Sequence, residues 1–304
     1  MSESVESRID IYPTRVNAEP KVLDRDDPTV WGSADSGPFS ADELAGYSRK
    51  GYLAIEDLVT QEEVGSFHAE LARLSEDPTV RADERTVIEA TSQQVRSIFE
   101  VHKISAVFDK IANDPRVVGR ARQILGSEVY IHQSRVNFKP GFEGKEFSWH
   151  SDFETWHAED GMPRMRAVSI SISMTDNYSF NGPLMIMAGS HTKYISCVGE
   201  TPQENYKSSL VMQGAGTPDK HTLTRFADTY GIDVLVGKAG GAVMFDSNCM
   251  HASNSNVTPY ARSNIFIVFN SVDNTLQEPF GAASPRPEFI ASHDGTPAGG
   301  SSDI

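Results

Sequence analysis

Apolar residues recur at helical spacing in the first 126 residues of the chain. Ser40 to Glu43 and Thr60 to Glu63 both have the capping-box pattern, which predicts that a helix begins at each position. Asp114-Pro115 predicts the start of another helix, and Gly126 predicts its end. We therefore expect residues 21–126 to be mainly helical.

From residue 127 onward the apolar period is that of β-strands. In 167–174, apolar residues and Ser alternate strictly, which is typical of a half-buried antiparallel strand. Turns rich in Gly and Asn, rather than helices, separate the predicted strands, so the pattern indicates a sandwich or a jelly roll. The predicted strands are 129–139, 166–175, 183–187, 242–246 and 264–270. The expected fold is mainly β with flanking helices, and its β core spans 127–280.

Three segments lack a periodic apolar face. Residues 1–20 are polar and predict a surface arm, and residues 281–304 are rich in Pro, Gly and Ser and predict a mobile tail. Residues 196–222 predict a long surface loop, and a loop of this length can also act as a lid. We expect a single domain over 1–304, since this length suits one β domain with helical additions.

Composition narrows the class of protein. The formal net charge of −15 argues against nucleic-acid binding, which requires a basic surface. The two cysteines, Cys197 and Cys249, do not suggest a disulfide framework. No secretory signal and no apolar run of membrane-spanning length is visible. A cytoplasmic protein without a membrane partner is therefore expected.

The segment from Phe147 to Pro163 carries the candidate chemistry. His150 and Asp152 are two residues apart, so on a β-strand they would point the same way and could bind one metal ion. His251 would supply a third ligand, and two His with one carboxylate leave positions open, as in non-haem Fe(II) oxygenases. The alternative is a surface His beside a solvated Asp. Surrounding aromatic residues favour a shielded pocket: Phe147, Trp149, Phe153 and Trp156.

Further polar residues could line the same pocket. One face of the predicted strand 129–139 carries Gln133, Arg135, Asn137 and Lys139. Unpaired burial of such groups is costly, so this face must meet either a polar ligand pocket or water, and a solvated outer face is the alternative.

Three more residues have both a structural and a functional interpretation. Arg262 begins a very apolar strand, where an isolated charge needs a partner, and it could bind an acidic co-substrate. Ser253 could assist Arg262 or merely cap a turn. Trp156 could belong to the core or could stack on a cation or ring.

Several segments resemble one family. The run from Phe147 to Pro163 matches throughout the signature of ectoine hydroxylases, a branch of the phytanoyl-CoA-hydroxylase-like 2-oxoglutarate dioxygenases. Asn181 to His191 resembles the second motif of the wider superfamily. Other segments that resemble the family are Ile11 to Arg15, Arg25 to Trp31 and His132 to Asn137. The resemblance runs from about residue 10 to residue 280.

The resemblance implies a double-stranded β-helix (jelly-roll, cupin-like) core and a homodimer. The implied ligands of Fe(II) are His150, Asp152 and His251. The implied contacts to 2-oxoglutarate come from Lys139, Arg262, Ser253 and Asn137. The implied contacts to ectoine come from Gln133, Trp156 and Arg135. The implied reaction consumes ectoine, 2-oxoglutarate and O₂ and yields 5-hydroxyectoine, succinate and CO₂.

Three other functions remain open at this point. The same chemistry could act on another small amino or imino acid. A zinc hydrolase could use the same three ligands and a bound water. A jelly roll without catalytic activity could bind a solute. Dependence on O₂ and 2-oxoglutarate separates these possibilities.

Overall fold

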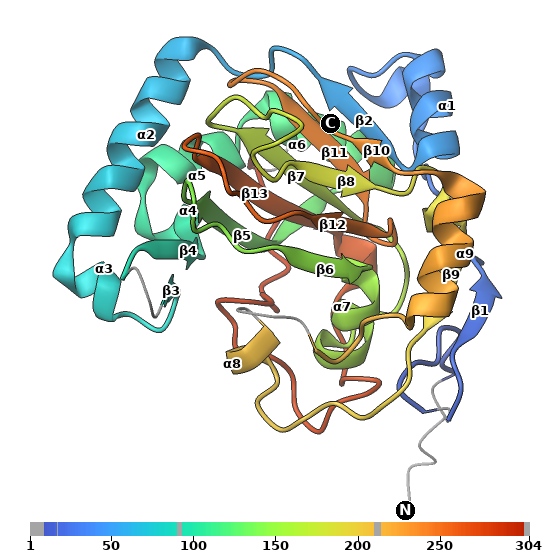
Figure 1. The fold of residues 1–304 in the computed structure, drawn as a ribbon. Coiled ribbons are helices and arrows are strands. Elements are labelled where there is room, and N and C mark those ends of the chain that lie inside the picture. Colours follow the sequence, from blue (N-terminus) through green and yellow to red (C-terminus); the bar gives the residue numbers. More distant parts are fainter. Residues whose placement is uncertain (1–8, 17, 90–92, 210–213, 301–304) are drawn as a thin grey trace, which may run out of the picture.

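The computed structural model of the chain describes residues 9–16, 18–89, 93–209 and 214–300. Parts of three predicted segments lie outside these residues: 1–8 and 17 of the arm, 210–213 of the long loop and 301–304 of the tail. Within the described residues, two antiparallel sheets form the centre and helices surround them (Figure 1). The expected jelly-roll class, mainly β with flanking helices, is confirmed.

The larger sheet has seven strands, and the smaller one has four. In spatial order, the large sheet consists of β2 (Tyr52–Ile55), β11 (Ala242–Asp246), β7 (Ala167–Ser173), β13 (Arg262–Ser271), β5 (Val129–Lys139), β4 (Val95–Phe99) and β3 (Thr86–Ile88). The small sheet consists of β10 (Asp233–Val234), β8 (Leu184–Ile186), β12 (His251–Ser253) and β6 (Phe147–His150). β1 (Lys21–Asp24) pairs separately with β9 (Lys193–Ser196). The predicted strands 129–139 and 242–246 have the observed bounds, and the others differ by one or two residues.

The predicted helix starts and ends are also observed. Ser40 and Thr60 form complete capping boxes, and Gly126 ends a helix in the left-handed conformation. The α-helices are α1 (Ala41–Lys50), α2 (Gln61–Glu76), α3 (Pro78–Ala82), α4 (Val101–Ile104), α5 (Ala106–Ala112), α6 (Pro115–Leu125), α7 (Asp152–Asp160), α8 (Tyr206–Ser209) and α9 (Lys220–Tyr230). Short 3₁₀ turns span Ala34–Ser36, Ser190–Thr192 and Val272–Asn274.

The two faces of the large sheet have different partners. Apolar side chains of β7 and β13, such as Ile170 and Ile267, pack in one core with apolar residues of α2, α5 and α6. The opposite face, which includes Ser171 and Asn264, lines a cavity together with residues of β6 and β12. Helices therefore cover one face, and the other is left for polar chemistry.

The prediction that strand 167–174 is half-buried is wrong. Every residue of β7 is buried, including Ser169, Ser171 and Ser173. β7 lies between β11 and β13, so its serine side faces the interior of the jelly roll rather than water. In this strand, the alternation of Ser with apolar residues therefore indicates that the serine side faces a polar interior.

A β-bulge in β5 explains why its polar face stops at residue 133. Gln133 pairs with Val268, but Ile131 pairs with the next residue, Phe269, so His132 is the extra residue. The bulge reverses the alternation, and Val129 and Ile131 join the apolar core beneath the helices.

In the described residues, the arm and the tail both pack against the rest of the protein. The sequence predicted a surface arm and a mobile tail instead. Tyr12 and Arg15 are buried, and Arg15 forms ion pairs with Glu154 and Glu159 of α7. The tail runs along β5, where Ser292 N donates to His132 O at 2.9 Å. Ile290 is buried with Phe99 and Phe289. Apolar residues are few in these two segments, so the polar composition of the segments did not indicate that they pack against the protein.

The remaining predictions about loops and cysteines have mixed outcomes. The predicted loop 196–222 contains α8 and the first turn of α9. Both cysteines are free and buried. Among the described residues, no helix combines the length and the apolar character needed to cross a membrane.

Because Ile290 is 0% exposed, replacing it should test how firmly the tail is packed. Ile290→Ala should lower the free energy of unfolding by about 2–5 kcal/mol, since it leaves a cavity in the apolar cluster. Ile9→Ala, at an 82% exposed position, is the matched control and should change it by less than about 0.5 kcal/mol. Equal urea midpoints for the two variants would contradict the packing of the tail.

Candidate metal centre

The proposed metal ligands His150, Asp152 and His251 come together at the edge of the small sheet. His150 ends β6 and His251 begins β12, and strand pairing places these two residues directly opposite each other. Asp152 does not lie on the strand, as the spacing argument assumed, but is the first residue of α7. A turn of the backbone, rather than β alternation, brings its carboxylate to the two imidazoles.

The geometry of the three side chains fits one metal ion. His150 Nε2 lies 3.4 Å from Asp152 Oδ1, and His251 Nε2 lies 3.9 Å from Asp152 Oδ2. One possible ligand atom from each residue lies within 4.8 Å of the others. Among the described residues, Asp152 Oδ2 is buried and has no hydrogen-bond partner. A divalent cation would satisfy this oxygen.

A hydrogen bond from Nδ1 to a backbone oxygen orients each imidazole. His150 Nδ1 donates to Ser148 O at 2.8 Å, and His251 Nδ1 donates to Cys249 O at 3.0 Å. These bonds set the tautomer, so both Nε2 lone pairs are available to a metal.

The protonation states of the site also suit a metal. Burial, together with the neighbouring His150 ring, lowers the pKa of His251 to about 4, so this imidazole is neutral near pH 7. Burial raises the pKa of Asp152, but His251, His150 and Arg135 together lower it by more, so the carboxylate is ionised. Two imidazoles and one carboxylate are the donor set predicted from the sequence.

Two cations lie next to each other on the large sheet. Arg262 and Lys139 are paired across β13 and β5, and neither forms an ion pair with another described residue. Lys139 Nζ donates to Ser253 Oγ at 2.9 Å, and Arg262 Nε donates to Asn177 Oδ1 at 3.2 Å. Burial, followed by the nearby Arg262 and Arg96, lowers the pKa of Lys139 to about 7. Burial lowers the pKa of Arg262 to about 10, so this pair would gain from an acidic ligand.

A second group of predicted residues occupies the neighbouring wall. Arg135 lies 4.4 Å above the ring of Phe266 and donates to Gln133 Oε1 at 2.7 Å. Gln133 Nε2 donates in turn to Ile290 O of the tail at 2.7 Å. Trp156, on α7, is almost fully buried and lines the same cavity.

All the predicted site residues line one cavity, together with several that the sequence reasoning missed. The predicted residues are Gln133, Arg135, Asn137, Lys139, His150, Asp152, Trp156, His251, Ser253 and Arg262. The missed ones include Phe245, Asn264, Phe266 and Arg286. Asn264 and Phe266 share the side of β13 that carries Arg262, so the alternation argument could have found them. No sequence pattern indicated Arg286, because the position of its side chain depends on an ion pair with Asp160, at 2.7 Å.

Comparisons with known proteins agree with this geometry. The family model described as phytanoyl-CoA dioxygenase (PhyH) matches residues 47–264. A Streptomyces coelicolor protein named ectoine dioxygenase is 57% identical over 298 residues, which span 98% of this chain and 99% of that protein.

Two crystal structures of EctD from S. alaskensis are also similar. The one with 2-oxoglutarate and 5-hydroxyectoine has a TM-score of 0.85 at 44% identity and covers 93% of this chain and 95% of that chain. The one with bound Fe has a TM-score of 0.85 at 43% identity, and the coverage is 95% of this chain and 97% of that chain.

Removing one imidazole should abolish tight metal binding. His251→Ala leaves two ligands, so anaerobic titration with Fe(II) should show a loss of affinity of at least about 100-fold. His293→Ala, at a partly exposed histidine of the tail, is the control and should bind Fe(II) like the wild type. Retention of wild-type affinity in His251→Ala would contradict the assigned ligands.

Proposed function

The chain belongs to the phytanoyl-CoA dioxygenase family, and on this premise we propose that it hydroxylates ectoine to 5-hydroxyectoine. It is a non-haem iron, 2-oxoglutarate-dependent dioxygenase. Turnover consumes 2-oxoglutarate and O₂ and releases succinate and CO₂, and one atom of O₂ enters each organic product. The observation that carries this conclusion is the buried group of two imidazoles and a carboxylate in one cavity with Arg262 and Lys139, which form no ion pair within the described part of the chain.

The three ligands, the ion and the rest of the protein would contribute different parts of the reaction. His150, Asp152 and His251 would hold Fe(II) on one face and leave the opposite positions open. When bound, Fe(II) with 2-oxoglutarate supplies O₂ activation and replacement of a ring C–H bond by C–OH. The protein binds the two organic substrates, orients them and keeps water away.

Arg262 and Lys139 are the proposed anchors for the far carboxylate of 2-oxoglutarate. Both residues lie on paired strands, Lys139 is positively charged when it is protonated, and the guanidinium of Arg262 can bind a carboxylate through two parallel hydrogen bonds. Ser253 Oγ already accepts from Lys139 Nζ, so it would help to orient the ammonium group. Asn137 Oδ1 accepts from Ser97 Oγ at 2.9 Å, which leaves its amide hydrogens for the co-substrate.

Trp156, Gln133 and Arg135 are the proposed contacts for ectoine. Ectoine has a delocalised amidinium and a carboxylate, so it requires an aromatic surface for one end and hydrogen-bond donors for the other. The hydrogen bond from Arg135 and the bond to Ile290 O fix the amide of Gln133 on both sides. The substrate would therefore meet groups that are already ordered.

Closure of residues 196–222 over the cavity remains a proposal. Asn205 and Ala215 from this segment line the cavity, and Asn205 Nδ2 donates to Glu159 Oε1 of α7 at 2.7 Å. A segment held in this place would exclude water from the reacting groups. The homodimer remains a prediction that rests on the family resemblance, and the cytoplasmic location remains a prediction that rests on the sequence pattern alone.

The reaction can be tested directly with labelled oxygen. Purified protein loaded anaerobically with Fe(II) should convert ectoine, 2-oxoglutarate and ¹⁸O₂ into 5-hydroxyectoine that carries one ¹⁸O atom, with one succinate for each product molecule. Mass spectrometry and succinate assays provide the readout. Succinate release only with another amino or imino acid would change the substrate, and turnover with zinc in the absence of O₂ would indicate a hydrolase.

The protonation of Lys139 should control the affinity for 2-oxoglutarate. Its pKa of about 7 means that the ammonium loses its proton as the pH rises, and the far carboxylate then loses one of its two cations. The apparent KM for 2-oxoglutarate should increase roughly fivefold from pH 7 to pH 8. Lys139→Met should have a high KM that varies little over this range. A constant wild-type KM, or the same rise in the variant, would contradict this role.

A further inference from the structure

The carboxylate ligand depends on a turn that lies outside the metal site. Strand pairing aligns the two imidazoles, but Asp152 follows the end of β6 and is not part of that pairing. Two bonds flank it instead. Ser151 Oγ donates to Asn248 Oδ1 at 3.0 Å, and Phe153 N donates to Ser247 O at 2.9 Å. The turn at residues 246–248 therefore holds the backbone on both sides of the carboxylate.

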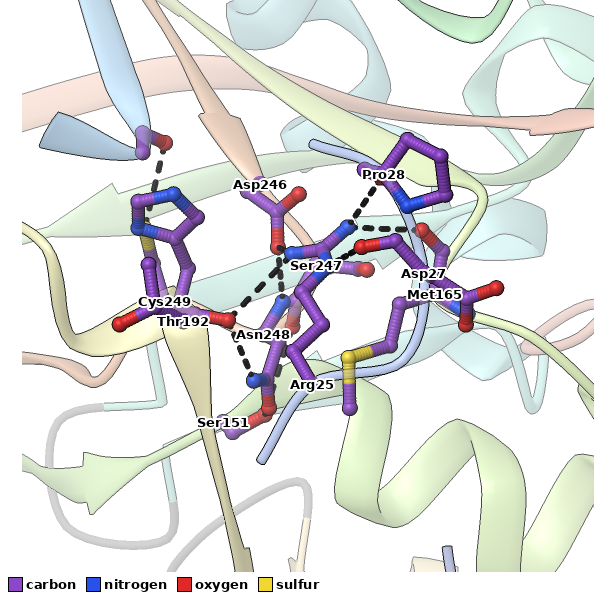
Figure 2. A network of polar contacts seen from close by, with 12 residues as sticks. Arg25, Asp27, Pro28, Ser151, Met165, Thr192, Asp246, Ser247, Asn248 and Cys249 are labelled. Atoms are coloured by element: carbon purple, nitrogen blue, oxygen red, sulfur yellow. Dashed lines mark hydrogen bonds and ion pairs between the residues drawn. The ribbon is translucent and has the colours of Figure 1, made fainter. Parts of the chain in front are cut away.

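Asn248 is the last residue of this turn, and both ends of its side-chain amide form hydrogen bonds (Figure 2). Its Nδ2 donates to His191 O and Lys193 O, both at 2.9 Å, while its Oδ1 accepts from Ser151. Its main-chain N donates to Asp246 Oδ1 at 2.8 Å. The residue is buried, so each of these bonds is sheltered from water. An amide is required here, because the side chain must donate and accept at once.

Arg25 supports the turn from the N-terminal segment (Figure 2). Its Nη1 donates to Asp246 Oδ1 at 2.8 Å, and the guanidinium is only 4% exposed. The remaining donors bind main-chain oxygens of Asp27, Pro28 and Met165. A guanidinium with this many fixed acceptors is held in one position, so Arg25 has a structural role at this turn.

We propose that Ser151 and Asn248, supported by Arg25 through Asp246, are positioning residues for the metal-binding carboxylate of Asp152. The inference rests on the proposed function, because it concerns the same iron site. A carboxylate at the first residue of a helix can turn away from a metal unless its backbone is held. Loss of partners behind a metal ligand typically weakens metal binding by about 10–100-fold.

Ser151→Ala tests the proposal with a small structural change. We expect anaerobic titration to show a dissociation constant for Fe(II) raised by about tenfold or more. The visible charge-transfer absorption of the Fe(II)–2-oxoglutarate complex should also change, because the carboxylate geometry changes. Ser105→Ala is the matched control. Ser105 precedes α5, is 5% exposed like Ser151, and its Oγ donates a hydrogen bond to Glu70 Oε1 of α2. This control should leave both readouts unchanged.

A double-variant cycle shows whether the two residues act through each other. If they do, Ser151→Ala combined with Asn248→Ala should have the Fe(II) affinity of Asn248→Ala alone. Wild-type Fe(II) affinity and absorption in Ser151→Ala, or fully additive losses in the double variant, would overturn the proposal. A wild-type protein that binds no Fe(II) would instead overturn the proposed function, so the two failures are distinguishable.

Discussion

An ionised carboxylate held in the interior between two imidazoles is the constraint on which this molecule depends. Asp152 Oδ2 is buried and, among the described residues, has no hydrogen-bond donor, and such a group costs several kcal/mol unless a cation compensates it. This energetically costly group lies at the edge of the small sheet, where strand pairing fixes the two imidazoles. A metal ion bound here would therefore also stabilise the fold.

The large sheet makes this polar interior possible by separating its two faces. Ile170 and Ile267 pack beneath the helices, and the burial of such residues is the main source of stability. Ser171 and Asn264 lie on the other face, where Asn264 Nδ2 donates to Ser171 Oγ at 2.8 Å. Polar side chains that form hydrogen bonds with one another can be buried at little cost, so the cavity can be lined by polar groups.

Segments on either side of the jelly-roll core in the sequence complete the site. The N-terminal segment contributes Arg15 to α7 and Arg25 to the turn at 246–248, and the tail contributes Arg286 to Asp160. All three arginines form buried ion pairs, in which removal of one partner would leave the other charge without compensation. The pairs of Arg15 and Arg286 connect the two ends of the chain to α7, the helix that begins with Asp152.

Local patterns in the sequence determined the helix starts, the polar face of β5 and the three candidate metal ligands, because capping, side-chain alternation and ligand chemistry depend on neighbouring residues. They could not show that Asp152 begins a helix, that His132 is an extra residue in β5, or that Arg286 reaches the cavity. These features depend on strand register and on ion pairs between residues more than a hundred positions apart, which only the folded chain brings into contact.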